Sequence, residues 1–336
     1  MIAPILLIPL ISSFILTFII IPYWIRKVKQ IKLEWKDMNK LGKEKIAGSG
    51  GITVIMGFIL SILLYIAIIT FYFKDNSNII ELFALTTTVL FLAGIGLVDD
   101  LFGWRHGGLS KKVRLILVIF SSIPLIVINA GESTVALPLL GRMSLGLIYP
   151  LILIPLGITG AATTFNFLAG MNGLEASQGA IILAALGVAT YFSGNSWLTL
   201  ICFLAVAALL SFWIFNKTPA KLFPGDVLTY PIGGLIAIIA ILGNVEKIAV
   251  FFFIPYIIEV ILKSRGNLKK QSFGKPNKDG SLDLLYDKIY GLTHLSIWFL
   301  KKFKKKVYEK DVVYFINFMQ LIIIVLGFIL FRQGIF

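Results

Sequence analysis

Residues 83–100 read FALTTTVLFLAGIGLVDD, an apolar run that ends on two adjacent carboxylates, Asp99 and Asp100. Hydrocarbon does not tolerate unpaired carboxylates, so two of them at the mouth of an apolar helix call for a cation or a proton. A helix end that simply faces water is the alternative when the pair is considered by itself. The position of the other polar residues along the chain decides between these two interpretations.

The composition places the chain among membrane proteins. Hydrophobic residues make up 58% of its 336 residues, the mean hydropathy is +0.91, and the apolar residues come in long uninterrupted blocks. The single cysteine, Cys202, lies inside an apolar block and excludes an internal disulfide framework. We therefore expect a polytopic membrane protein.

The apolar blocks predict about ten transmembrane helices. Each block is long enough to cross ~30 Å of hydrocarbon, and they fall at about residues 1–25, 46–73, 79–98, 113–130, 145–165, 176–192, 196–215, 227–243, 248–262 and 312–331. A polar, lysine-rich segment of about residues 263–311 separates the last two. The predicted fold is all-α, a single integral membrane domain over residues 1–336.

The Lys and Arg residues predict the orientation, because loops that stay in the cytosol retain positive charge. With the N-terminus outside, the inner loops hold eight in 26–45, four in 99–114, two in 216–226 and thirteen in 263–311, which is 27 of the 31. The net charge of +14 therefore records membrane topology and anionic headgroups, and no nucleic acid is expected as a partner. This topology predicts a multi-pass protein of the cell membrane whose polar motifs face the cytoplasm.

Polar residues gather at this one predicted face. Asp99 and Asp100 end the third span, Asn166 to Glu175 follow the fifth, and Asp226 precedes the eighth. A transporter needs polar groups near the midplane and often has related halves, and no convincing internal repeat is found. The pattern favours an enzyme that acts at the inner membrane surface on a soluble charged substrate and a lipid. A transporter or channel for a cation or anionic metabolite is the rival from another class.

The residue types suit a divalent cation and a diphosphate. Asp226 follows Pro224-Gly225 at the opening of a helix, where it either caps the helix or binds a hard cation. Mg²⁺ prefers one or two carboxylates, and Asn166 is able to add a carbonyl oxygen. Basic neighbours of the aspartate pair complete a mixed-sign site typical of diphosphate neutralisation: Lys111, Lys112 and Arg114.

A glycine-rich stretch, Gly170-Met171-Asn172-Gly173-Leu174, lies between Asn166 and Glu175. It matches neither a Walker P-loop nor a dinucleotide fingerprint. It is interpreted either as a tight turn between helices or as a turn whose Asn172 binds a nucleobase edge.

Three motifs in this order resemble the polyprenyl-phosphate N-acetylhexosamine-1-phosphate transferases. They are Asp99-Asp100, the stretch NFLAGMNGLEA from Asn166 to Ala176, and Phe223-Pro224-Gly225-Asp226. The Asn-Gly-Leu-Glu-Ala form is most similar to the eukaryotic and archaeal branch, the UDP-GlcNAc:dolichyl-phosphate GlcNAc-1-phosphate transferases. The sequence Asp37-Met-Asn39-Lys40 also resembles that branch, and the similarity covers essentially the whole chain.

The resemblance implies a role for each matching residue. Asn166 and Asp226 match ligands of Mg²⁺ (or Mn²⁺) and pyrophosphate, and Asp99 and Asp100 match the paired aspartates of the catalytic centre. The remaining matches are to substrate-binding groups: Asn172 with Gly170 in the uridine-binding turn, Glu175 beside it, and Lys111 as the phosphate-contacting residue, with Lys112 as the second candidate.

The chain departs from the family in the segment 263–311. A His-rich or Arg-His-Ile-Pro-Arg run in relatives corresponds here to a stretch in which Lys275 and Lys278 carry the charge, either as substrate-binding groups or as part of a solvated loop. Apolar residues from Leu284 to Phe299 recur at helical spacing and predict an interfacial amphipathic helix that ends in the lysine run 301–306. His294 is expected on the surface of that helix.

The resemblance implies that the protein transfers GlcNAc-1-phosphate from UDP-GlcNAc to a polyprenyl (dolichyl) phosphate. The products are polyprenyl-diphosphate-GlcNAc and UMP, which is the first membrane step of lipid-linked glycan assembly for protein N-glycosylation. The alternative within the class is a bacterial-type enzyme that uses undecaprenyl phosphate and another UDP-sugar. The Ile- and Lys-rich composition hints at an archaeal source, and pairing into a homodimer is left open.

Overall fold

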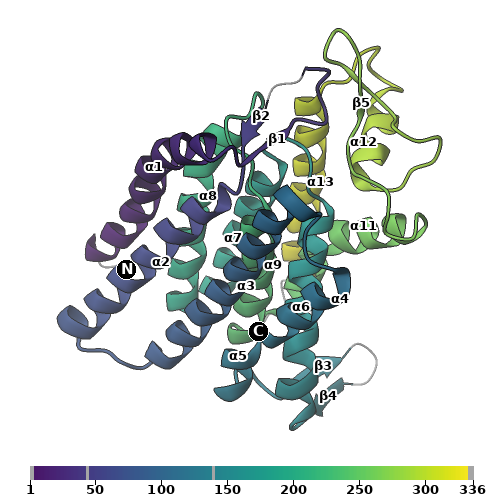
Figure 1. Ribbon diagram of the computed structural model, residues 1–336. Coiled ribbons are helices and arrows are strands. Elements are labelled where there is room, and N and C mark those ends of the chain that lie inside the picture. Colours follow the sequence, from purple (N-terminus) through teal and green to yellow (C-terminus); the bar gives the residue numbers. More distant parts are fainter. Residues whose placement is uncertain (1–3, 43–44, 138–140, 332–336) are drawn as a thin grey trace.

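A computed structural model describes residues 4–42, 45–137 and 141–331, and most of them are helical (Figure 1). Seven helical segments in these ranges are long and apolar enough to cross a membrane: Pro4–Gln30, Gly51–Phe73, Ile79–Gly103, Tyr149–Phe167, Leu174–Phe192, Ser196–Asn216 and Glu309–Leu330. The chain is therefore a multi-pass α-helical membrane protein, as the sequence predicts.

The long helices follow the predicted order. They are α1 (Leu7–Gln30, after a 3₁₀ turn at Pro4–Leu6), α2 (Gly51–Ile68, extended by a π turn at Ile69–Phe73), α3 (Ile79–His106), α6 (Ile154–Phe167, after a π turn at Tyr149–Leu153), α7 (Leu174–Phe192), α8 (Ser196–Asn216) and α13 (Glu309–Leu330). The third predicted span ends at Val98, but α3 continues to His106. Asp99 and Asp100 therefore lie inside the helix, where contacts with other helices hold them.

Shorter helices occupy the other three predicted spans. Residues 113–130 contain α4 (Lys111–Phe120) and α5 (Ile123–Val127), residues 227–243 form α9 (Asp226–Leu242), and residues 248–262 contain α10 (Glu246–Phe252) and α11 (Ile254–Ser264). Prolines follow both breaks, Pro124 in α5 and Pro255 in α11, because proline cannot donate the backbone hydrogen bond that would continue the preceding helix. All ten predicted stretches contain helix, but two of them are broken.

Helix α9 lies at the centre of the bundle, packed mainly between α3 and α6 (Figure 1). It is buried along almost its whole length. Close approach to α3 depends on Gly96, since a Cβ atom there would lie 2.3 Å from the Asp226 carbonyl oxygen. This packing fixes the start of α9 against the end of α3, where the polar motifs meet.

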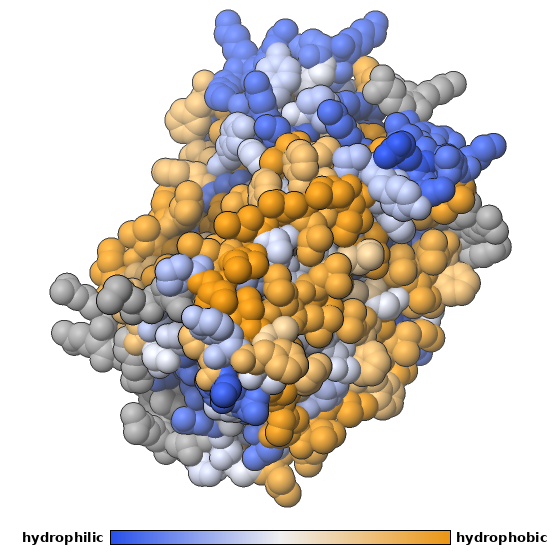
Figure 2. Space-filling view, turned by 90° about the vertical axis from the view of Figure 1, so that its left-hand side faces the viewer, coloured by the Kyte–Doolittle hydropathy of each residue, from blue (hydrophilic) through white to orange (hydrophobic). Residues whose placement is uncertain are grey.

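Small sheets lie at the two ends of the bundle. Strands β1 (Glu34–Lys36) and β2 (Lys45–Ala47) pair antiparallel, as do β5 (Lys275–Pro276) and β6 (Leu282–Asp283), and both pairs lie at the end that carries α12 (Leu292–Leu300). Strands β3 (Thr134–Leu137) and β4 (Gly141–Ser144) pair at the opposite end. Figure 2 shows a broad hydrophobic band between hydrophilic ends, as burial in a bilayer requires.

The predicted amphipathic helix over residues 284–299 is only partly correct. Helix forms at Leu292–Leu300 alone, because Leu282–Asp283 pairs as β6 and the backbone of Gly291 is extended, with φ −175°. Within the lysine run that follows, Lys304 and Lys306 form ion pairs with Asp311 and Asp279. Their charges are therefore partly used within the protein.

The prediction for His294 is wrong. Helix α12 packs against α11 and α13, and His294 is 1% exposed, with Nε2 3.1 Å from the Phe273 carbonyl oxygen. Burial is the largest cause of its shift and lowers the pKa of His294, because desolvation disfavours the charged imidazolium.

Candidate active site

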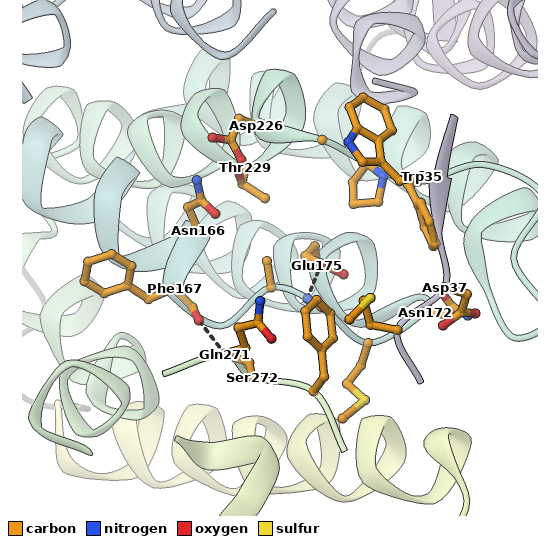
Figure 3. Close-up of a pocket in the computed structure, with 18 of the residues that line it drawn as sticks. Trp35, Asp37, Asn166, Phe167, Asn172, Glu175, Asp226, Thr229, Gln271 and Ser272 are labelled. Atoms are coloured by element: carbon orange, nitrogen blue, oxygen red, sulfur yellow. Dashed lines mark hydrogen bonds between the residues drawn. The ribbon is translucent and has the colours of Figure 1, made fainter. Parts of the chain in front are cut away.

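A cavity of about 590 Å³ (Figure 3) is lined in part by Trp35 and Lys36 of β1. Strand β1 lies with β2 and α12 at one end of the bundle (Figure 1). Six of the residues to which the sequence analysis gave a role in the site line the cavity: Asp100, Asn166, Gly170, Asn172, Glu175 and Asp226. They come from α3, from the end of α6, the connection that follows it and the first turn of α7, and from the start of α9. Segments far apart in the sequence thus meet at one site.

Asp100 caps the first turn of α9. The backbone N–H of Asp226 donates to Asp100 Oδ1 at 2.8 Å, and that of Val227 donates to Oδ2 at 3.4 Å. A carboxylate at a helix N-terminus satisfies orphan N–H groups and interacts favourably with the helix dipole. Gly225 allows this approach, since its φ is +71° and a Cβ atom there would lie 2.2 Å from Asp100 Oδ2. Asp100 therefore positions Asp226.

Asp99 belongs to a second cluster, centred on Arg114. The Arg114 guanidinium lies 3.2 Å from Asp99 Oδ2 and 3.6 Å from Asp226 Oδ2, and it donates to the Tyr230 hydroxyl at 2.9 Å. The backbone N–H of Leu109 donates to Asp99 Oδ1 at 2.6 Å. Arg114 thus links the aspartate pair to Asp226 and offsets their negative charge.

Arg114 is the basic residue of this cluster that contacts Asp99 and Asp226, whereas the assignment of Lys111 to the phosphate stays a prediction. Lys111, Lys112 and Arg114 all lie outside the cavity lining, and Lys111 Nζ lies 3.5 Å from the Leu268 carbonyl oxygen. Counting along the chain locates the basic cluster but not which of its members faces the aspartates. Arg114 lies one turn into α4 and faces Asp99, whereas the two lysines are exposed at its first turn.

Asn166, Asp226 and Thr229 lie on one wall of the cavity, and Figure 3 shows their side chains close together. Thr229 Oγ1 is buried and has no hydrogen-bond partner among the described residues. In residues 4–42, 45–137 and 141–331, no three Asp, Glu, His or Cys side chains converge as a ready-made metal cage. Mg²⁺ commonly takes one or two carboxylates and otherwise water and phosphate oxygens. The carboxylate, amide and hydroxyl oxygens on this wall fit that demand.

Glu175 shapes the connection between α6 and α7. Its Oε1 accepts a 2.8 Å hydrogen bond from the backbone N–H of Gly170, and Glu175 is itself buried. Ser272, from the segment before β5, donates to the Phe167 carbonyl oxygen at 3.2 Å (Figure 3). The turn predicted to bind uridine is therefore fixed on both sides.

Lys275 and Lys278 do not line the cavity. Lys275 is in β5, and Lys278 lies beside a separate hollow with Asn39, Lys40 and Glu309. The lysines that do line the cavity are Lys36 and Lys263. Lys263 Nζ lies 3.7 Å from Glu259 Oε1, with which it forms an ion pair along α11.

Glu309, the first residue of α13, is a site residue that sequence reasoning missed. It is 4% exposed and accepts a hydrogen bond from the backbone N–H of Asn172 at 2.8 Å. Asn172 and Glu309 are 137 positions apart in the sequence. No spacing pattern in the sequence therefore indicates that they are in contact. The Asp37-Met-Asn39-Lys40 sequence lies in the same cluster, since Lys40 pairs with both Asp37 and Glu309.

Comparison with known proteins identifies the family. Residues 82–244, which include both the aspartate pair and Asp226, match the profile of glycosyl transferase family 4. A protein of Saccharolobus solfataricus is 38% identical over 295 residues, which cover 86% of this chain and 87% of that one. It is provisionally named a UDP-N-acetylglucosamine–dolichyl-phosphate N-acetylglucosaminephosphotransferase.

Two further relatives extend the comparison to eukaryotes and bacteria. The protein of Dictyostelium discoideum that bears the same name is 29% identical, over 74% of this chain and 68% of its own. The phospho-N-acetylmuramoyl-pentapeptide-transferase of Streptococcus equi subsp. zooepidemicus is 29% identical, over 74% of this chain and 76% of its own. The chain therefore belongs to glycosyl transferase family 4, the polyprenyl-phosphate N-acetylhexosamine-1-phosphate transferases, in the branch that archaea share with eukaryotes.

Proposed function

We propose that the protein transfers GlcNAc-1-phosphate from UDP-GlcNAc to a polyprenyl phosphate of the dolichyl type. The products are polyprenyl-diphosphate-GlcNAc and UMP. The names of the archaeal and Dictyostelium relatives support this donor and acceptor, and the archaeal relative matches 86% of this chain. Lipid-linked glycan assembly for N-glycosylation would use the product.

The observation that carries the proposal is the cavity at the end of the apolar bundle. Asp100, Asn166 and Asp226 come together there from three separate segments, next to helices whose outer faces are apolar (Figure 2). At this end of the apolar bundle, a water-soluble nucleotide sugar and the phosphate of a membrane lipid can both reach the cavity. A transporter would require such polar groups near the bilayer midplane.

The proposed reaction is an in-line phosphoryl transfer. An oxygen of the lipid phosphate forms a bond to the β-phosphorus of UDP-GlcNAc, the bond from that phosphorus to the bridging oxygen breaks, and UMP leaves with the electron pair. Enzymes of phosphoryl transfer act mainly by positioning groups and by stabilising charge. Arg114, held between Asp99 and Asp226, supplies a fixed positive charge beside the reacting groups.

We propose that Asp226 and Asn166 hold Mg²⁺, or Mn²⁺ in its place, with Thr229 beside them. Bound there, the ion would neutralise charge on the diphosphate. Asp99 and Asp100 act as positioning groups, since the carboxylate of Asp100 caps α9 and that of Asp99 pairs with Arg114. A monoester phosphate has a second pKa of about 6, so the attacking group needs little help from a base.

The excess of Lys and Arg on the loops beside the cavity supports a cytoplasmic position for the site. These loops carry 27 of the 31 basic residues. In a prokaryotic cell the membrane concerned would be the plasma membrane. Pairing into a homodimer stays a prediction.

The proposal is tested by incubating the purified protein with UDP-GlcNAc, dolichyl phosphate and Mg²⁺. UMP and a diphosphate-linked lipid are expected in equal amounts. Turnover only with undecaprenyl phosphate and UDP-MurNAc-pentapeptide would favour the bacterial-type reaction. Transmembrane flux of a solute without any product would instead favour a transporter.

A further inference from the structure

The side-chain amide of Asn172 is held by two carboxylates. Asn172 Nδ2 donates to Asp37 Oδ2 at 2.9 Å and to Glu309 Oε2 at 3.2 Å. Glu309 Oε1 also accepts the backbone N–H of Asn172 at 2.8 Å. Asp37, between β1 and β2, and Glu309 of α13 thus both bind Asn172, which lies in the connection between α6 and α7.

Both carboxylates are buried and fixed by further contacts. Their side chains are 5% exposed, and the Lys40 ammonium lies 3.0 Å from each. Burial alone would lower the pKa of Lys40, but Glu309 and Asp37 outweigh it and raise that pKa. Asn39 donates to Glu309 Oε1 at 3.3 Å and to the Gly170 carbonyl oxygen at 2.7 Å. The grip on Asn172 is therefore part of one rigid polar network.

This network decides which end of the Asn172 amide faces the cavity. An ionised carboxylate only accepts hydrogen bonds, so the NH₂ group of the amide must point toward Asp37 and Glu309. Both of its hydrogens are then engaged. Asn172 lines the cavity, and the atom left to meet a ligand there is the carbonyl oxygen, which only accepts.

We infer that Asp37 and Glu309 are specificity-determining positioning residues. They orient Asn172 so that its side-chain carbonyl oxygen accepts a hydrogen bond from an N–H group of the nucleobase. The inference rests on the proposed function, in which the nucleotide is uridine. Uracil has one N–H on its pairing edge, at N3, whereas N3 of cytosine is an acceptor. A fixed carbonyl oxygen accepts a hydrogen bond from the uracil N3–H. It repels the lone pair on cytosine N3 and would be left without a partner, which is costly for a buried polar group.

The inference is tested by comparing Glu309→Gln and Asp37→Asn with the wild type. Either change places an amide against the Asn172 amide and frees Asn172 to reorient. We expect the KM for UDP-GlcNAc to rise about tenfold, as for loss of a buried charged partner, with kcat and the KM for dolichyl phosphate little changed. The preference for UDP-GlcNAc over CDP-GlcNAc, as a ratio of kcat/KM values, should fall by a similar factor.

Asp311→Asn is the matched control. Asp311 lies in the same first turn of α13 but pairs with Lys304 and accepts from the Tyr308 N–H, away from the cavity. It should leave the donor KM and the nucleotide preference as in the wild type. An unchanged donor KM and preference in folded Glu309→Gln and Asp37→Asn proteins would overturn the inference.

A second measurement uses the unmodified protein, so it does not depend on whether the variants fold. UMP, CMP and N3-methyl-UMP are compared as inhibitors of the wild-type reaction. We expect CMP and N3-methyl-UMP to inhibit about tenfold more weakly than UMP, because both lack the N3–H donor. Equal inhibition by all three would contradict the inference, whereas a wild type that makes no product from UDP-GlcNAc would contradict the proposed function instead.

Discussion

The backbone N–H of Asp226 donates a 2.8 Å hydrogen bond to the carboxylate of Asp100. One aspartate of the pair in α3 therefore caps the helix that begins with the proposed metal ligand. The second aspartate, Asp99, reaches Asp226 through Arg114. The position of Asp226 thus depends on both members of the pair, which explains how carboxylates at the end of one apolar helix serve a site built on another.

Removing the Asp100 cap should disturb Asp226 without unfolding the bundle. Asp100→Ala is expected to cost about 1 kcal/mol of stability, the usual effect of losing a helix cap, and to lower kcat sharply. Gly225→Ala should reproduce the loss of activity with the carboxylate still present, because the new Cβ atom would lie 2.2 Å from Asp100 Oδ2. Gly94→Ala on α3 is the control, since outside the backbone of its own helix turn no atom lies within 4 Å of its Cβ position. UMP release and thermal unfolding in detergent report the two effects.

Arg114 should matter far more than the nearby lysines. Arg114→Met leaves Asp99 and Asp226 without their cation and is expected to lower kcat about 100-fold, as for removal of a preorganised electrostatic group. Arg114→Lys should recover only part of the activity, because lysine lacks the planar fork that spans several acceptors. Lys111→Met and Lys112→Met should change kcat little. A larger effect from Lys111→Met than from Arg114→Met would contradict this role of Arg114 and support Lys111 as the phosphate-contacting residue.

Thr229 offers a test of the proposed metal wall. Thr229→Val removes the unpartnered hydroxyl and keeps the shape of the side chain, and we expect an activity loss of about tenfold, equivalent to one hydrogen bond. The concentration of Mg²⁺ that gives half-maximal activity should rise as well. Thr88 is also buried in the protein, and its hydroxyl likewise has no partner among the described residues, but it does not line the cavity. Thr88→Val should therefore leave both quantities unchanged.

Removal of divalent cations should stop turnover reversibly. EDTA is expected to abolish UMP release, and added Mg²⁺ or Mn²⁺ should restore it, because a diphosphate needs a hard cation to offset its charge. Asp226→Ala and Asn166→Ala should remain inactive at any Mg²⁺ concentration while the protein stays folded. Full activity of either variant, or of the EDTA-treated wild type, would contradict the proposal that Asp226 and Asn166 hold a divalent cation.

His294 predicts a pH dependence of stability. Its folded pKa lies below the ordinary value of 6.5, so as the pH falls through that value the unfolded state takes up a proton that the folded state does not. Unfolding is therefore favoured progressively below about pH 6.5 until the folded pKa is reached. The thermal midpoint of the wild type should fall more between pH 7.5 and 5.5 than that of His294→Gln, which does not titrate. Equal changes in the two proteins would show that His294 contributes nothing to the dependence.

Much of the fold was predictable because long apolar stretches in a membrane protein have few alternatives to helix. The six candidate site residues that line the cavity were also picked out from the sequence, since rare polar residues at the ends of apolar helices indicate function. The broken helices α4–α5 and α10–α11 were not predicted as such. Hydropathy registers their apolar residues but not the point at which the chain turns.

Other errors came from contacts between distant segments. Spacing did not show that Arg114 is the basic residue of α4 that meets Asp99. The position of His294 was wrong because α12 packs against α13, which a helical repeat cannot reveal. Glu309 went unnoticed since an acidic residue at the first turn of a helix is ordinary in a sequence, and only the structure brings it to Asn172.

The most direct test follows the fate of the β-phosphorus of the donor. The protein is incubated with UDP-GlcNAc labelled with ³²P at the β-position, together with dolichyl phosphate and Mg²⁺, and the lipid and aqueous phases are separated. Transfer of GlcNAc-1-phosphate predicts that the label enters the lipid and that the aqueous product is unlabelled UMP. Label that leaves in UDP, with an unlabelled sugar on the lipid, would contradict the account, because the sugar would then have been transferred without its phosphate.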